Sequence, residues 1–298
     1  FPLTPPNIVP QLSQNNSAFT PKIGLEWQAT KDAFVYFNVT RGFKSGGYNF
    51  TARSPLGLTF QPEYITSYEA GAKTDWFDKR LRLNVAVFRN DWSNLQVNQS
   101  ISIPGSTTPF QQSSNAASAR ITGLDADLTA KPWDGWTFTS SVTWLPDAVY
   151  VNYTTGQVTG NFLKNLIISR NDPRENSAAN TYNANGHRLQ NAPEVSAIIT
   201  GQRDFDLGNG NSLFVRGEAA YTGNTYFDIS NDPISRRNPF AVFNASIGWV
   251  STGGHYQVEL WGRNIGDKQY FYSINPGTTM EGVVGAPRTF GVQLNYTY

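Results

Sequence analysis

The chain has 298 residues, of which 23 are Lys or Arg and 22 are Asp or Glu, so its formal net charge is only +1. A nucleic-acid-binding protein would carry a basic excess, and a chain without cysteine has neither disulfide bonds nor thiolate metal sites. The mean hydropathy of -0.41 does not separate a soluble protein from a membrane barrel, because alternating strands average to a mildly polar value.

About eleven segments alternate apolar and polar residues, the pattern of a β-strand with one apolar face. Their length of about ten residues suits a tilted strand that crosses a bilayer. The clearest is the last, in which Phe290, Val292, Leu294, Tyr296 and Tyr298 share one face. The preceding segments lie, in chain order, near Lys22, Ala33, Tyr68, Arg80, Leu124, Trp136, Glu194, Ser212, Asn238 and His255.

The connections between these segments are alternately short and long, as in barrels with short periplasmic turns and long extracellular loops. We therefore predict an all-β fold, an antiparallel transmembrane β-barrel. The short connections are 30–32, 77–79, 132–135, 207–211 and 251–254. The long ones are 45–63, 99–114, 151–192, 226–237 and 266–287.

Large aromatic residues gather near the short connections and the C-terminus, as in the girdle of a barrel at the lipid–water interface. A soluble β-sandwich is the alternative, but it would need a second sheet to cover them. They are Trp27, Trp76, Phe77, Trp133, Trp136, Phe205, Trp249, Tyr256, Tyr296 and Tyr298.

About eleven strands do not close a bacterial barrel, because single-chain barrels have an even number of strands and an open edge in lipid leaves backbone groups unpaired. The chain also begins at Phe1 rather than at Met. We therefore expect residues 1–298 to be the C-terminal portion of a larger barrel. Residues 1–16 would be a truncated outer loop, and 17–298 would hold the strands, turns and loops.

Several stretches resemble TonB-dependent receptors, specifically the iron-complex receptor group. Each match is weak alone, but together they follow the order and spacing of the family over nearly the whole chain. They are FVYFNVTRGFKSGGYNF (34–50), PEYITSYEAGAKTDW (62–76), RLRLNVAVFRNDWSNLQV (80–97), NAASARITGLDADL (115–128), LQNAP (189–193), LWGRNIGDKQY (260–270) and PRTFGVQLNYTY (287–298).

This resemblance implies a barrel of about 22 strands with a plugged lumen, of which this chain supplies about eleven strands without the plug. It also implies residence in the bacterial outer membrane and TonB-energised import, with a ferric siderophore or another iron complex as the expected ligand. The implied partners are outer-membrane lipid, the outer-membrane assembly machinery, and the N-terminal plug domain and TonB, both outside this chain. Family members also import cobalamin and saccharides, so the ligand stays open.

The long 151–192 connection is the best candidate for ligand capture. Its cations and aromatic residues suit an acidic, aromatic ferric chelate through charge-assisted contacts and stacking. An ordinary solvated loop is the alternative. The candidates are Tyr153, Phe162, Lys164, Arg170, Arg174, Tyr182, His187 and Arg188, together with Arg41 and Lys44 near the outer mouth, where they would face the plug or an anionic ligand.

The terminal strand resembles the signal that the outer-membrane assembly machinery reads, through Phe290, Val292, Leu294, Tyr296 and Tyr298. An ordinary lipid-facing strand would show the same alternation. Charges on the polar faces come in pairs along single strands that we expect to interact: Lys22 with Glu26, Glu69 with Lys73, Arg216 with Glu218, and Glu259 with Arg263.

We predict no enzymatic activity, no cofactor and no metal site, since G-x-S-x-G is absent and the two histidines make no metal cluster. Two other functions remain open: a passive porin-like channel without a plug, and a soluble sugar-binding β-sandwich.

Overall fold

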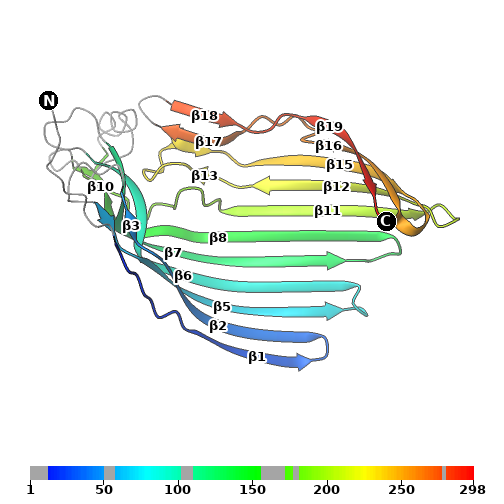
Figure 1. Ribbon diagram of the computed structural model, residues 1–298, viewed down its shortest axis with the longest axis horizontal. Coiled ribbons are helices and arrows are strands. Elements are labelled where there is room, and N and C mark those ends of the chain that lie inside the picture. Colours follow the sequence, from blue (N-terminus) through cyan, green and yellow to red (C-terminus); the bar gives the residue numbers. More distant parts are fainter. Residues whose placement is uncertain (1–12, 50–57, 102–109, 156–171, 177–180, 277–279) are drawn as a thin grey trace.

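The computed structural model describes residues 13–49, 58–101, 110–155, 172–176, 181–276 and 280–298. Eleven long strands pair side by side in chain order to form one antiparallel sheet (Figure 1). The all-β prediction is confirmed, and so is the number of long strands. They are β1 (Lys22–Thr30), β2 (Ala33–Lys44), β5 (Glu63–Trp76), β6 (Leu81–Ile101), β7 (Phe110–Ala130), β8 (Trp136–Thr155), β11 (Val195–Asp206), β12 (Ser212–Thr222), β15 (Phe240–Val250), β16 (Tyr256–Arg263) and β19 (Thr289–Tyr296).

Short turns join the strands at one end of the sheet and long connections join them at the other (Figure 1). The turns cover 31–32, 77–80, 131–135, 207–211 and 251–255. The C-terminus lies at the short-turn end. The long connections carry small paired elements: β3 (Gly47–Tyr48) with β4 (Thr59–Phe60), β9 (Glu175–Asn176) with β10 (Thr181–Asn183), β13 (Thr225–Tyr226) with β14 (Arg236–Arg237), and β17 (Phe271–Pro276) with β18 (Met280–Val284).

Three strands are much longer than the ten residues expected of a membrane strand, since β6 and β7 have 21 residues each and β8 has 20. The prediction of a loop over 99–114 was therefore wrong at both ends: β6 runs to Ile101 and β7 begins at Phe110. Polar residues continue the pairing there, and Ser113 donates a 2.8 Å hydrogen bond to Asn98 on the opposite strand. Between Asn98 and Ser113 the paired residues are mostly Asn, Gln and Ser, so the sequence shows little apolar–polar alternation there.

The sheet has an apolar outer face and a polar inner face. Outer side chains remain uncovered: Leu25 is 72% exposed and Leu260 is 53% exposed, which in water would be an aggregation surface. The outer face is therefore the lipid-facing one. One row across it, each residue paired with the next, is Trp27, Val35, Ala72, Val85, Ala126 and Val142.

The adjacent row on the inner face consists of Glu26, Tyr36, Gly71, Ala86, Asp125 and Thr143. Thr143 donates a 2.7 Å hydrogen bond to Asp125. Gly71 is required here because the ring of Tyr36 lies over it, and a Cβ atom at this position would be 2.5 Å from Tyr36 Cζ. The inner face of the sheet is thus polar, and its side chains pack closely against one another.

The expected charge pairs along single strands do not form ion pairs within the described part of the chain. Neighbours across a ladder are closer than residues two apart on one strand, and Arg216 and Glu218 have cross-strand partners instead. Asn244 donates a 2.7 Å hydrogen bond to Glu218, and Arg216 Nε donates one of 2.8 Å to Gln202. The prediction failed because it considered each strand alone.

Most buried side chains lie beyond the membrane-spanning sheet, between the long connections. Ala117, Tyr150, Tyr153, Tyr182, Ala184 and Ile229 form one buried cluster. Two short 3₁₀ turns, η1 (Pro233–Ser235) and η2 (Thr252–Gly254), complete the structure. None of the helices in the described ranges has the length and apolar character to cross a membrane.

The face assignment predicts opposite effects for one substitution at adjacent residues. Val85 faces outward in the middle of the apolar band, so Val85→Arg should destabilise the intact barrel by about 2–4 kcal/mol, the cost of a lipid-facing arginine near the bilayer centre. Asn84 faces inward beside Asp127, and Asn84→Arg should cost less than about 1 kcal/mol. Denaturant unfolding in lipid vesicles measures both, and equal destabilisation would contradict the assignment.

Candidate functional site

Three long connections at the loop end of the sheet are joined to one another. They are the β8–β11 connection (156–194), the β12–β15 connection (223–239) and the β16–β19 connection (264–288). The contacts between them come from the side chains of His187, Asn231 and Arg237. These contacts give the loop end a defined shape.

His187 is the principal contact between the first two connections. Its side chain is buried, and Nδ1 lies 2.7 Å from the carbonyl oxygen of Ile229. A carbonyl only accepts, so Nδ1 carries the proton; Nε2 then accepts from the Arg174 guanidinium. The ring therefore links two segments that are 42 residues apart in the sequence.

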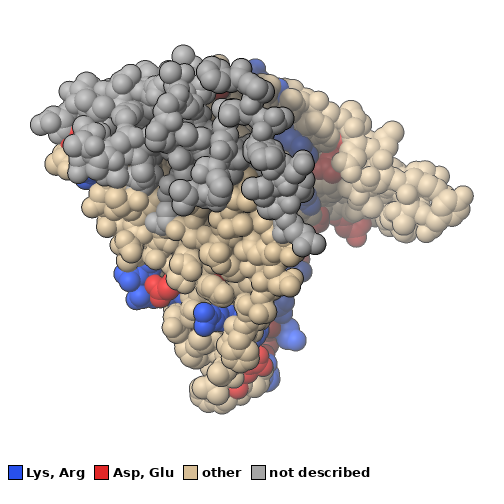
Figure 2. Space-filling view, turned by 60° about the vertical axis from the view of Figure 1, so that its left-hand side comes forward, with Lys and Arg blue, Asp and Glu red and all other residues tan. Residues whose placement is uncertain are grey.

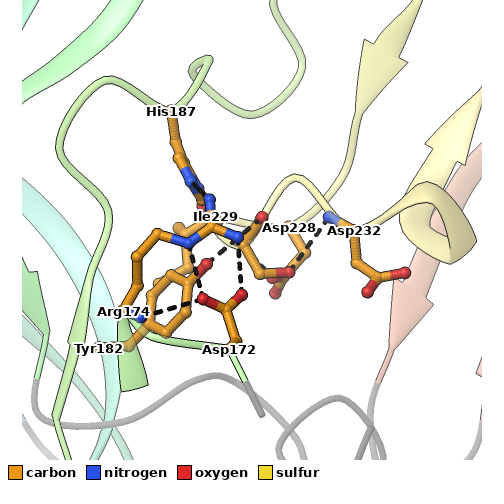
Figure 3. A network of polar contacts seen from close by, with 8 residues as sticks. Asp172, Arg174, Tyr182, His187, Asp228, Ile229 and Asp232 are labelled. Carbon is orange, nitrogen blue, oxygen red and sulfur yellow. Dashed lines mark hydrogen bonds and ion pairs between the residues drawn. The ribbon is translucent and has the colours of Figure 1, made fainter. Parts of the chain in front are cut away.

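Arg174 lies beside His187 in a network of polar contacts (Figure 3). Its Nη2 and Nε donate to the carboxylate of Asp172 at 2.6 and 2.8 Å, the fork geometry of a strong pair. Its guanidinium also lies 5.8 Å from the ring centroid of Tyr182, whose edge meets the His187 ring. Arg174 is still 45% exposed, so one side of a well-oriented cation faces solvent.

The side chain of Arg188 holds two backbone carbonyl groups and does not face outward. Its Nη2 donates to Leu145 O at 2.7 Å and its Nε donates to Ala192 O at 2.8 Å. Its backbone N–H donates to the Asn231 side chain at 2.6 Å, and Asn231 donates back to the Arg188 carbonyl at 3.0 Å. This reciprocal pair is a second contact between the first two connections.

Arg237 joins the second and third connections. Nη1 donates to Phe271 O at 3.1 Å, and Nη2 donates to Thr225 Oγ1 at 3.1 Å. The guanidinium lies 5.0 Å from the ring centroid of Phe240, which stacks on Tyr270 at 4.3 Å. Arg237 was not predicted as a site residue, because no local sequence pattern marks an arginine outside the longest loop for such a role.

The candidate residues thus occupy several different environments. Tyr153 and Tyr182 are fully buried, His187 is nearly so, and they form the interior of the loop structure. Arg41 lies on the outer face of β2, in line with Val39 and Phe37, whereas Lys44 lies on the inner face. Phe162, Lys164 and Arg170 lie outside the described residues.

The surroundings change the protonation equilibria of the His187 network. Burial is the main cause that lowers the pKa of His187, while the hydrogen bond to Ile229 acts in the opposite direction. The hydrogen bonds from Arg174 lower the pKa of Asp172. His187 is therefore neutral and Asp172 charged at neutral pH, which agrees with the donor and acceptor roles above.

On the face shown in Figure 2, the charged side chains form small patches of both signs rather than one field of a single sign. No group of three or more His, Cys, Asp or Glu residues in the described ranges has the arrangement of a metal site. The chemistry available at the loop end is therefore that of isolated, oriented cations beside aromatic rings.

The lowered pKa of His187 predicts that acid loosens the contact between the two connections. The neutral form is the one that fits, so the contact is at full strength above the ordinary pKa of 6.5 and weakens as the pH falls below it. Arg174, Asp172 and Asp228 are the charged groups that act on the ring. Hydrogen exchange over 183–192 and 225–235, corrected for intrinsic rates, should be faster at pH 5 than at pH 7.5.

The matched variants are His187→Gln and His255→Gln. The first removes the titrating group and should abolish the extra acid-induced exchange. The second changes the other histidine, which is exposed in the short turn between β15 and β16 and should leave the effect intact. Acid-induced exchange that persists in His187→Gln would assign the effect to another group.

Known proteins share this fold and this sequence pattern. A family described as TonB dependent receptor-like, beta-barrel, matches residues 3–265. The metal-pseudopaline receptor CntO of Pseudomonas aeruginosa is 32% identical over 118 residues, which are 40% of this chain and 15% of that protein. The probable TonB-dependent siderophore receptor PiuA of Acinetobacter baumannii is 22% identical over 297 residues, covering 96% of this chain and 35% of PiuA.

The ferric yersiniabactin uptake receptor FyuA of Yersinia pestis superposes with a TM-score of 0.70 at 21% identity, over 92% of this chain and 36% of FyuA. The siderophore receptor PiuA of Acinetobacter baumannii superposes with a TM-score of 0.66 at 18% identity, over 92% of this chain and 35% of PiuA. The chain spans at most about a third of the length of these relatives. Receptors of this family are integral proteins of the outer membrane, so the apolar band of this sheet lies in that membrane. The chain belongs to the TonB-dependent receptors, and it forms part of their β-barrel.

Proposed function

We propose that the protein to which this chain belongs imports a ferric siderophore or a similar iron complex through the outer membrane, driven by TonB. The observation that carries the proposal is the family match over 3–265. The relatives that match along the chain support the ligand class, since they include a siderophore receptor and a ferric yersiniabactin uptake receptor. This chain supplies barrel wall and extracellular loops.

The inner wall offers a polar surface on which a plug domain could pack. Arg216, Glu218, Glu259, Arg263 and Trp261 line an open hollow of about 470 Å³ on that face. Its mixture of both charges, amides and an aromatic ring suits a folded polar domain. A plug domain and TonB are accordingly the proposed partners.

Ligand capture is proposed for the joined loop end. Tyr153, Tyr182 and His187 support the loop from inside, and Arg174 presents the exposed, oriented cation. Phe162, Lys164 and Arg170 of the same connection remain part of the proposal. Lys44 lies on the inner face of β2, at its loop end. An acidic chelate would meet a preformed guanidinium there, which reduces the entropy lost on binding.

A passive porin-like channel remains the alternative. The soluble sandwich is excluded by the family and by the uncovered apolar band.

Uptake of radioactive iron distinguishes energised transport from passive diffusion. Cells that carry the intact receptor, grown without iron, are given radioactive iron as ferric catecholate, hydroxamate or carboxylate chelates. We expect saturable uptake of one class, abolished by a protonophore and in cells without TonB, while binding at the cell surface persists. Uptake that rises linearly with concentration and ignores the protonophore would replace the proposal by the porin-like channel.

Arg174→Ala should weaken surface binding of the imported chelate by about tenfold or more, because a charge-assisted contact is lost. The control is Arg80→Ala, an exposed and ion-paired arginine at a periplasmic turn, which should bind as the native receptor does. Equal binding by all three proteins would remove Arg174 from the ligand site without affecting the transport proposal.

A further inference from the structure

Five charged residues lie on the lipid-facing side of the sheet, where charge is costly within the bilayer. They form what we call the outer-rim arginine cluster: Arg41 on β2, Arg89 and Asp91 on β6, Arg120 on β7 and Asp147 on β8. The ladder puts Arg41, Thr66, Asp91 and Arg120 in one continuous row across four strands. Arg89, Thr122 and Asp147 form the adjacent row, two residues nearer the membrane centre.

The faces follow from the register. Arg41 has the parity of Phe37, Arg89 that of Val85, and Arg120 that of Leu124, all of which belong to the apolar outer face. In the described long strands, the other outward-facing charge is Arg203, at the periplasmic end of β11. The outer faces of β12, β15, β16 and β19 carry none. Within the described strands, the cluster is thus confined to the side of the sheet formed by β2, β6, β7 and β8.

The height of the cluster matches the level of lipid headgroups. Trp76 marks the lower aromatic boundary on β5, and Thr66, in the row of Arg41 and Arg120, lies ten residues further along the same strand. At about 3.4 Å per residue and a tilt of about 40°, this is about 26 Å above Trp76. An apolar band is about 25 Å tall, so Arg41 and Arg120 lie where the band ends, and Arg89 lies about 5 Å lower, inside its upper edge.

Ion pairs orient Arg89 and Arg120, but several guanidinium nitrogen atoms of the cluster have no hydrogen-bond acceptor among the described residues. Asp91 accepts from Arg89 at 2.9 and 3.1 Å and from Arg120 at 3.3 Å, which fixes both guanidinium groups. Within the described residues, Nη1 of Arg89, both Nη atoms of Arg120 and the whole Arg41 guanidinium make no hydrogen bond to protein. Arg89 and Arg120 are 49% and 36% exposed. Three cations face two carboxylates, so a positive charge is left over.

We propose that the outer-rim arginine cluster binds the phosphate group of a phosphorylated lipid in the outer leaflet of the outer membrane. A guanidinium fork matches phosphate oxygens in geometry and charge, and basic groups at this level attract anionic headgroups. The acyl chains of the same molecule would lie along the apolar rows below, which include Val87 and Leu124. The site is on the opposite face of the wall from the ligand path.

The test uses the intact receptor in a maltoside detergent, titrated with fluorescent lipid A that keeps its phosphates and with its dephosphorylated analogue. The native receptor should bind the phosphorylated lipid at least about tenfold more tightly, and increasing salt should reduce the difference. Arg89→Gln with Arg120→Gln should lose the preference. Arg41→Gln, which breaks no ion pair, should lose part of it and so guards against misfolding of the double variant.

The control is Arg203→Gln, an outward-facing arginine at the opposite rim, which should bind as the native receptor does. Equal binding of the two lipids by the native receptor would overturn the proposal. So would displacement of the lipid by millimolar inorganic phosphate, which would identify a site for soluble anions instead.

Discussion

Inside a bilayer no water is available to satisfy a backbone amide, so each strand must obtain its hydrogen bonds from the strands beside it. This constraint explains the continuous ladder from β1 to β19. It also explains why the sheet itself has no core, because one face must meet lipid and the other the lumen. The large side chains that are fully buried, such as Tyr153, Tyr182 and Asp228, lie instead at the loop end of the sheet. The interior of this protein is thus assembled above its membrane wall.

The sequence was most informative where that constraint acts on every second residue. Period-two alternation identified each membrane strand, and loop length identified which end is which. Beyond the bilayer the alternation ends, so paired polar residues such as Gln99 and Gln112 were predicted as a loop. Residues an odd number of positions apart on a strand lie on opposite faces. The sequence therefore also implied that Arg41 and Lys44, which are three residues apart, face opposite sides of β2.

The loop end could be predicted only in outline. Composition identified cations and aromatic rings in one connection, but burial there depends on partners from a different connection. His187 is held by Ile229, and Arg188 by Asn231, at separations of 42 and 43 residues. No local pattern encodes such contacts. The role of an arginine at the loop end could not be predicted from its residue type either. Arg174 is about half exposed, Arg188 donates to backbone carbonyls, and Arg237 lies beside aromatic rings.

In the proposed receptor, whose long connections face the outside of the cell, the extra length of β6, β7 and β8 has an immunological consequence. About ten residues of each of β6 and β7 continue beyond the rim of the membrane, hydrogen-bonded to the neighbouring strand. A flexible loop must be ordered when an antibody binds it, whereas this extension is already held in shape by its ladder. One side of the receptor therefore offers a preformed sheet epitope, and an immune response against it would recognise a conformation rather than a linear peptide.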